Sequence, residues 1–208
     1  MPDDASPPIE KVNGQLRIVL TGGPGGGKTT AADLFRREIG DQVVVVPEAA
    51  TLLFSGGFPR IDDPAAVVPT QRAIFQAQRS LEQVQAARFP GRILLCDRGT
   101  VDGAAYWPGR EEAFFEAMGT TLEDELGRYD AVIFFETAAA AGLSIEGGNP
   151  SRIEDLETAV RLDRHLQQIW RRHPDFVMVP HNPSFFKKIT FGLASIESIV
   201  AQLRARAR

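Results

Sequence analysis

Five short apolar segments recur along the chain, and each ends in polar, Gly or Pro residues. They are rich in Val, Ile, Leu or Phe and do not alternate strictly with polar residues: Leu16–Leu20, Val43–Val46, Ile93–Cys96, Ala131–Phe135 and Phe176–Val179. Continuous apolar runs of this length are typical of strands buried on both faces, as in a parallel sheet covered by helices. We therefore expect five buried strands.

Helical patterns lie between these segments. Within Thr70–Phe89, Ile74, Ala77, Leu81 and Val84 fall at spacings of three and four, which places them on one helix face. Further helices are predicted within Thr29–Ile39, Glu111–Met118, Leu122–Gly127, Ser151–Arg172 and Ser184–Arg204. Strands that alternate with helices indicate an α/β fold with a mostly parallel sheet and right-handed crossovers.

Length and composition add the domain organisation. The chain has 208 residues, which suits one domain over residues 15–208. Residues 1–14 are rich in Pro, Asp and Gly, and we expect them to form a flexible arm.

Charge and cysteine content exclude several classes of protein. The net charge of −4 argues against a nucleic-acid partner, which normally requires a basic face. The single cysteine, Cys96, excludes an internal disulfide and a cysteine-cluster metal site. No apolar run approaches the ~18 residues of a membrane span, and the acidic N-terminus lacks a signal segment. We therefore expect a cytoplasmic protein without a membrane span.

One segment fits the phosphate-binding motif G-x-x-x-x-G-K-[ST] completely, between a predicted strand and a predicted helix. Its glycines allow backbone N–H groups to approach phosphate oxygens, and the following helix directs its positive end at the same point. The alternative is a glycine-rich turn before a helix. The predicted nucleotide-binding residues are Gly23, Gly25, Gly26, Gly27, Lys28, Thr29 and Thr30.

Three side chains of this motif have distinct expected roles. Lys28 would reach the β- and γ-phosphates, the Thr29 hydroxyl would bind Mg²⁺, and Thr30 would lie near the α-phosphate. The motif therefore predicts a nucleoside triphosphate site.

Asp97 ends the apolar segment Ile93–Cys96, in the Walker B pattern. At the carboxyl edge of a parallel sheet this carboxylate would face the phosphate loop, where it would hold Mg²⁺ directly or through water. The alternative is that Asp97 caps a helix that begins near Thr100.

Glu48 follows the segment Val43–Val46 and Pro47, which ends the strand. Its carboxylate would point into the same crevice and accept a proton from an attacking hydroxyl. The alternative is that Glu48 starts the next helix, where a negative charge is favourable.

These motifs resemble the P-loop kinase-like branch of the P-loop NTPases. The closer resemblance is to the AAA-domain family of small ATP/GTP-binding proteins, which includes the TRPL translocation defect protein and is related to the ribosylnicotinamide kinase domain of the bacterial NAD regulator. The segments that carry the resemblance are Thr21–Thr30, Pro47–Ala50, Gly56–Pro59, Phe75-Gln76, Asp97–Gly99, Tyr106-Trp107, Asn149–Arg152 and Trp170–Pro174. The resemblance implies a three-layer P-loop NTPase sandwich, whose five parallel strands lie in the order 2-3-1-4-5 with helices on both faces.

The chain also resembles the deoxynucleoside kinases. The resemblance implies that Glu48 takes the proton of the acceptor hydroxyl and that Asp97 and Arg98 serve metal and phosphate. It also implies that Phe75 and Gln76 help to hold the acceptor base. This chain has Asp97 where those enzymes have Glu, and Gly99 where they have Ser.

Small-molecule kinases close an arginine-bearing segment over the phosphates. The candidate lid here is Ala138–Arg164, which carries Arg152, Arg161 and Arg164. A guanidinium suits phosphoryl oxygens because it binds them with two parallel hydrogen bonds. The alternative is that these arginines pair with acidic neighbours on a solvated helix.

Aromatic side chains are candidates for the wall of an acceptor pocket. Phe58, Tyr106 and Trp107 would stack on a planar base, or would instead fill the core or rim. Asn182 and Phe185, after the fifth strand, are candidate contacts to the donor base.

Two functions remain open at this point. The first is a kinase that uses Mg²⁺ and ATP to phosphorylate a small hydroxyl-bearing molecule, with a nucleoside-like compound as one candidate. The second is a nucleotide-binding switch that binds ATP or GTP and hydrolyses it slowly. The GTPase motif N-K-x-D is absent, which favours ATP. A mechanical AAA+ ATPase is disfavoured, because the chain offers no separate helical lid domain.

Overall fold

The computed structural model describes residues 15–141 and 156–206. The strands are β1 (Arg17–Thr21), β2 (Val43–Val46), β3 (Ile93–Asp97), β4 (Ala131–Phe135) and β5 (Phe176–Val179). The α-helices are α1 (Lys28–Ile39), α2 (Ala49–Ser55), α3 (Pro64–Arg88), α4 (Glu111–Met118), α5 (Leu122–Leu126), α6 (Leu156–Trp170) and α7 (Phe185–Arg206). Short 3₁₀ helices are η2 (Gly40–Gln42), η3 (Thr100–Tyr106) and η4 (Ala138–Ala141).

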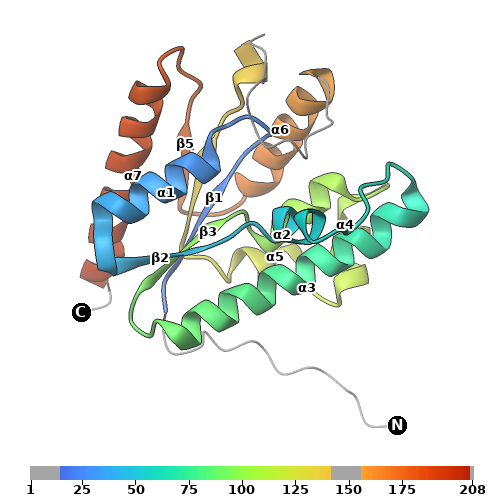
Figure 1. Cartoon of the computed structure of the whole chain (residues 1–208), viewed down its shortest axis with the longest axis horizontal. Helices are drawn as coiled ribbons and strands as arrows, with labels where there is room; N and C mark the ends of the chain where they lie inside the picture. Colours follow the sequence, from blue (N-terminus) through green and yellow to red (C-terminus); the bar gives the residue numbers. More distant parts are fainter. Residues whose placement is uncertain (1–14, 142–155, 207–208) are drawn as a thin grey trace.

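The strands form one parallel sheet in the order β2-β3-β1-β4-β5, which confirms the predicted topology (Figure 1). Helices cover both faces of this sheet, as expected for parallel strands connected by helical crossovers. The fold is therefore the α/β sandwich that the sequence predicts.

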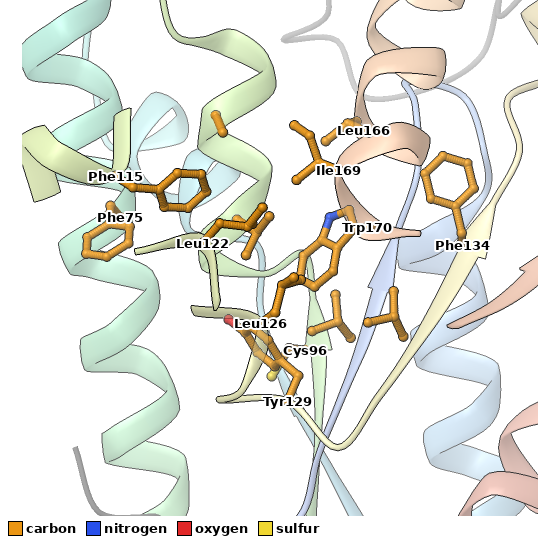
Figure 2. Packing of buried hydrophobic residues seen from close by; sticks show 14 of the residues in the cluster. Phe75, Cys96, Phe115, Leu122, Leu126, Tyr129, Phe134, Leu166, Ile169 and Trp170 are labelled. Carbon is orange, nitrogen blue, oxygen red and sulfur yellow. The ribbon is translucent and has the colours of Figure 1, made fainter. Parts of the chain in front are cut away.

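Successive residues of each strand point to opposite faces, so both faces build a core. Ile18 and Leu20 of β1 pack with α1 and α7, whereas Val19 packs on the opposite side. That opposite core is formed with α3, α4, α5 and α6, and its centre is Trp170, which Figure 2 shows reaching from α6 toward Tyr129 and Cys96. Burial on both faces explains why the strand sequences are continuously apolar.

Helix α3 begins at Pro64, six residues before the predicted start. Asp63 caps it, because its side chain accepts a hydrogen bond from the Ala65 N–H at 2.8 Å, and Pro64 takes the first helical position, where no N–H is needed. Pro69 lies inside this helix without ending it. The longer α3 brings residues near its start to the carboxyl edge of the sheet.

None of the helices within residues 15–141 and 156–206 is both long enough and apolar enough to span a membrane.

Candidate active site

The carboxyl ends of all five strands meet at one edge of the sheet, because the strands are parallel. The phosphate loop follows β1, Glu48 lies two residues after β2, and Asp97 is the last residue of β3. Ligands of open α/β sheets bind at this edge. The fold therefore brings together the three positions that the sequence singles out.

The phosphate loop connects β1 directly to α1. Gly25 and Gly27 have φ of 78° and 84°, a left-handed conformation that favours glycine, and Gly27 is the N-cap of α1. Lys28 opens the helix, is only 5% exposed, and donates from Nζ to the carbonyl of Gly23 at 2.7 Å. The strand, loop and helix thus have the arrangement of a phosphate-binding loop, and its contacts to nucleotide stay a prediction.

The glycines of this loop are also required by the protein around them. A Cβ on Gly22 would overlap the carbonyl of Phe135, and one on Gly26 would lie 2.7 Å from the same oxygen. A Cβ on Gly23 would lie 2.6 Å from a carboxylate oxygen of Asp163. The sequence suggested phosphate contact as the reason for the glycines, and the structure adds close packing against β4 and α6.

Thr29 and Asp97 form the candidate metal site. The Thr29 hydroxyl donates to Asp97 Oδ2 at 2.7 Å. Asp97 Oδ1 is buried and has no hydrogen-bond partner among the described residues. A hydroxyl beside a carboxylate with one free oxygen is a hard-oxygen donor set, which fits Mg²⁺. Burial, and next the negative charge of Glu48, raise the pKa of Asp97, and a bound cation would offset both effects.

No cluster of three or more His, Cys, Asp or Glu side chains suited to a metal occurs in the part of the chain that the structure describes. A cation at Thr29 and Asp97 would therefore need further oxygen ligands, which triphosphates supply in this class of site.

Glu48 is fixed by two hydrogen bonds. Arg98 Nε donates to Glu48 Oε1 at 2.6 Å, and the Thr51 hydroxyl donates to Oε2 at 2.6 Å. Burial opposes ionisation of this carboxyl, but the charge of Arg98, the Thr51 hydrogen bond and the charge of Lys28 outweigh it and lower the pKa. Glu48 is therefore a carboxylate at neutral pH.

The sequence also allowed Asp97 and Glu48 to be helix caps, and the structure differs between the two residues. Gly99, not Asp97, is the N-cap of η3, so Asp97 does not cap the helical segment at Thr100. Glu48 does occupy the N-cap position of α2, but its carboxylate makes no capping hydrogen bond to the helix backbone. The carboxylate of Glu48 instead points to Arg98 and Thr51.

Arg98 links Glu48 to a second buried acid, Asp102. Its NH1 donates to Asp102 Oδ2 at 2.9 Å, while Asp102 Oδ1 accepts from the Thr21 hydroxyl at 2.8 Å and from Trp170 Nε1 at 2.6 Å. No sequence motif marks Asp102, so the sequence alone does not reveal it. It joins the end of β1, the end of α6 and Arg98.

A cavity of about 490 Å³ opens beside these groups. Glu48, Arg98 and Asp102 lie on its wall with Pro24 of the phosphate loop, so the cavity extends from the loop to the candidate base. Its other lining residues include Phe54, Arg60, Gln71, Phe75, Gln78, Tyr106, Thr158, Arg161 and Leu162.

Three predicted acceptor contacts lie outside this lining. Gln76 is exposed, because it stands about 100° around α3 from Phe75. Trp107 packs edge-on against Phe114, with ring centroids 5.5 Å apart, in the core. Phe58 is half-buried beyond the end of α2, where its N–H donates to Leu53. These three side chains lie outside the lining, whereas Tyr106 is part of it, and contact of any of the four with an acceptor stays a prediction.

The buried amides on the cavity wall are Gln71 and Gln78. Gln78 is already used by the protein, since it accepts from the Ala49 N–H at 3.4 Å and donates to Glu82 at 3.3 Å. Gln71, one turn before Phe75, is 8% exposed. It is the better candidate for the role that the sequence gave to Gln76.

The lid and donor-base predictions have mixed outcomes. Arg152 lies outside the described residues, Arg161 lines the cavity, and Arg164 does not. The Asn182 side chain accepts from the Ser184 N–H at 2.9 Å, just before α7. A Cβ on Gly27 would lie 2.7 Å from the Phe185 ring, so Phe185 packs against the phosphate loop.

The comparisons with known proteins agree with this geometry. The family described as AAA domain matches residues 17–184, which contain the phosphate loop, Glu48 and Asp97. The chain belongs to this P-loop kinase-like family. No curated protein matches the sequence.

A solved structure with a similar fold is deoxyadenosine kinase from M. mycoides with bound dATP. It aligns with a TM-score of 0.59 and 14% sequence identity, over 88% of this chain and 100% of that one. At this identity the likeness shows a shared fold.

Three residues that support the phosphate loop, two of them within the matched AAA domain, have no sequence signature. Asp163 Oδ1 accepts from the Gly23 N–H at 2.8 Å and from the Thr137 N–H at 3.0 Å, and the Thr137 hydroxyl donates to the Pro24 carbonyl. Lys188 Nζ donates to the carbonyls of Gly26 at 2.8 Å and Glu136 at 2.6 Å. Their partners lie far away in sequence, so only the folded chain reveals them.

Proposed function

We propose that this protein is an ATP- and Mg²⁺-dependent kinase that transfers the γ-phosphoryl group to a hydroxyl of a small, nucleoside-like molecule. The observation that carries the proposal is the cavity that reaches from Pro24 of the phosphate loop to the Glu48–Arg98 pair. A protein that only binds or hydrolyses nucleotide has no need of a cavity beside its phosphate loop with a carboxylate fixed at its wall.

The donor side rests on the phosphate loop. Its backbone N–H groups, the N-terminus of α1 and Lys28 would hold the phosphates of ATP. Thr29 and Asp97 would hold Mg²⁺, which neutralises negative charge on the transferring group when bound. The structure with a similar fold contains bound dATP, which agrees with a nucleoside triphosphate as a ligand of this fold, and GTP remains the alternative donor.

The acceptor side rests on Glu48. The acceptor oxygen would attack the γ-phosphorus while the bond between that phosphorus and the bridging oxygen of ADP breaks, and the hydroxyl proton would pass to Glu48. Arg98 and Thr51 leave lone pairs of the carboxylate available, because each donates only one hydrogen bond to it. The lowered pKa of Glu48 keeps it deprotonated at neutral pH, which is the state that a general base requires.

The cavity lining favours a planar acceptor with polar edges. Phe75 and Tyr106 offer aromatic surface, and Gln71 offers an amide that both donates and accepts. A volume of about 490 Å³ lies within the range of small-molecule sites. These features support a nucleoside or similar riboside as the acceptor class.

The test is Glu48→Gln, measured against a panel of nucleosides, ribosides and vitamins for ATP-dependent phosphorylation. Gln preserves the shape of Glu but cannot take the proton, so phosphorylation should fall ~10²–10⁴-fold. ATP affinity should change by less than a few-fold. Glu38→Gln, at an exposed position of α1, is the matched control and should behave as the parent protein does.

Two outcomes would reject the general-base role. One is a parent protein that phosphorylates no acceptor, combined with a Glu48→Gln variant that binds and hydrolyses ATP as the parent does, which would favour the nucleotide switch. The other is a phosphorylated acceptor whose turnover is unchanged by Glu48→Gln.

A further inference from the structure

A buried carboxylate joins the phosphate loop to α6. Asp163 is 3% exposed, and its Oδ1 accepts from the N–H of Gly23 and the N–H of Thr137. The absence of a side chain on Gly23 permits this approach, since a Cβ there would lie 2.6 Å from the same oxygen. Burial raises the pKa of Asp163, although the hydrogen bonds from Gly23 and Thr137 and the positive charge of Lys28 oppose this effect.

The helix that carries Asp163 also forms one wall of the cavity. Thr158, Arg161 and Leu162 line that cavity, and Leu162 is adjacent to Asp163 in the chain. A helix is stiff along its axis, so a shift of Asp163 relative to the loop would move these three residues with it. The contact with Gly23 therefore helps to fix the position of this cavity wall relative to the phosphate loop.

The C-terminal end of α6 contacts the buried acid Asp102. Trp170 Nε1 donates to Asp102 at 2.6 Å, and Asp102 in turn holds Arg98. Figure 2 shows this indole pointing from α6 into the core. Helix α6 thus contacts the phosphate loop at Asp163, the cavity at Arg161, and the Arg98–Glu48 pair through Trp170.

We propose that Asp163 is a positioning residue that couples nucleotide binding at the phosphate loop to the acceptor cavity through α6. Nucleotide binding reduces the mobility of the loop. The Asp163–Gly23 hydrogen bond then reduces the mobility of α6, the helix that lines the cavity. Coupling of this kind is reciprocal, so an occupied cavity would also strengthen nucleotide binding. The term acceptor cavity rests on the proposed function, whereas the coupling between loop and helix does not.

Hydrogen exchange measured by mass spectrometry tests the coupling without turnover. The probe is a non-hydrolysable ATP analogue with Mg²⁺, and the peptides are those of the loop, residues 21–32, and of α6, residues 157–170. In the parent protein we expect the probe to slow exchange several-fold in both peptides. In Asp163→Ala the slowing should remain in the loop at saturating probe and be lost in α6.

Three variants complete the test. Gly23→Ala disrupts the same contact from the loop side, because its Cβ would collide with Asp163. It should also remove the slowing in α6 at probe concentrations that still protect the loop. It carries the test if Asp163→Ala does not fold. Asp163→Asn keeps an oxygen that accepts from both N–H groups and should restore most of the slowing. Glu157→Ala removes an exposed acid from the same helix and should match the parent.

Several results would overturn the proposal. The first is that the probe still slows exchange in α6 of both Asp163→Ala and Gly23→Ala. The second is that the probe protects the loop of the parent protein but does not slow exchange in α6. The third is that Glu157→Ala loses the slowing in α6 to the same extent as Asp163→Ala. A purely structural role would lower the melting temperature without changing the response of α6 to the probe.

A kinetic measurement separates this proposal from the proposed function. Once an acceptor that the parent protein phosphorylates has been identified, Asp163→Ala should raise the KM for this acceptor by more than ten-fold, with a smaller effect on kcat. If no acceptor is found, the kinase proposal fails, and the exchange experiment still decides whether Asp163 couples the loop to α6.

Discussion

Arg98 occupies a strained backbone conformation at the centre of the site. Its φ is 72°, and it is the one non-glycine residue with positive φ within residues 15–141 and 156–206. A conformation of this kind costs ~1–3 kcal/mol and persists where the surroundings hold it. Here the ion pairs of Arg98 with Glu48 and Asp102 hold it, at 2.6 and 2.9 Å. This backbone conformation places the guanidinium between both acids.

Asp97 is the residue with which to test the metal site. We expect Asp97→Asn to weaken ATP binding in the presence of Mg²⁺ by at least ten-fold, because the amide removes the charged metal ligand. With EDTA the parent and the variant should bind ATP within a few-fold of one another. Calorimetry under both conditions makes the comparison, and equal losses in both would show that Asp97 has a structural role instead.

The contrast between Gln71 and Gln76 shows why residue roles are harder to predict than motifs. Neighbours on a helix point about 100° apart, whereas residues three or four apart share a face. Gln71 and Gln78 stand four before and three after Phe75, so all three line the cavity, and Gln76 turns to solvent. The spacing contains this information, whereas the resemblance to a Phe-Gln pair marks Gln76, so which glutamine contacts an acceptor stays a prediction.

At the scale of elements, the strands could be predicted because their segments are continuously apolar. β1, β3 and β4 are fully buried, and the edge strands β2 and β5 are partly buried. β2, β4 and β5 have the predicted bounds, β3 extends one residue further, and β1 is shifted by one residue at both ends. The phosphate loop was equally clear, since its motif, strand and helix are contiguous. The start of α3 could not be predicted from the sequence, because Pro69 inside the helix resembles a helix boundary. The contacts of α6 and α7 to the loop depend on packing between distant segments.

Helix α7 supports the phosphate loop through Lys188. This side chain is 5% exposed and lies against the carbonyls of Gly26 and Glu136. Burial, opposed by the charges of Asp163 and Glu136, lowers its pKa from 10.5 to about 8. In the unfolded chain the pKa would be the ordinary one, so the unfolded state binds more protons between these two values.

The sign of the resulting pH dependence follows. As the pH rises from 7.5 to 9.5, Lys188 loses its proton in the folded state first, and the parent should gain stability relative to Lys188→Met. The expected gain is about 1–2 kcal/mol. Urea unfolding at both pH values measures it, with Lys187→Met at the exposed neighbouring position as the control. A stability difference between parent and Lys188→Met that is independent of pH would contradict the lowered pKa.

At the scale of the whole molecule, the two halves of the chain contribute differently to the site. The segments up to β3 and the Arg98–Asp102 turn after it supply the phosphate loop and the acids, all recognisable in sequence except Asp102. The later segments supply Thr137, Asp163, Trp170 and Lys188, which hold these groups in place. Ligand binding at the loop should therefore stabilise both halves together.

Thermal unfolding tests this expectation. A ligand that binds only the folded state at 100 times its Kd adds about 2.7 kcal/mol of stability. For a domain of this size that corresponds to a rise in Tm of ~5–10 °C. We expect ATP with Mg²⁺ to produce such a shift in one cooperative transition, and Lys28→Ala to abolish most of it, because the variant lacks the charged phosphate contact. Lys28 also bonds to Gly23 in the protein itself, so the comparison uses the shift caused by ATP and not the Tm of the variant alone. An equal shift in Lys28→Ala, or two separate transitions of which only one responds to ATP, would be incompatible with nucleotide binding at a loop that both halves hold.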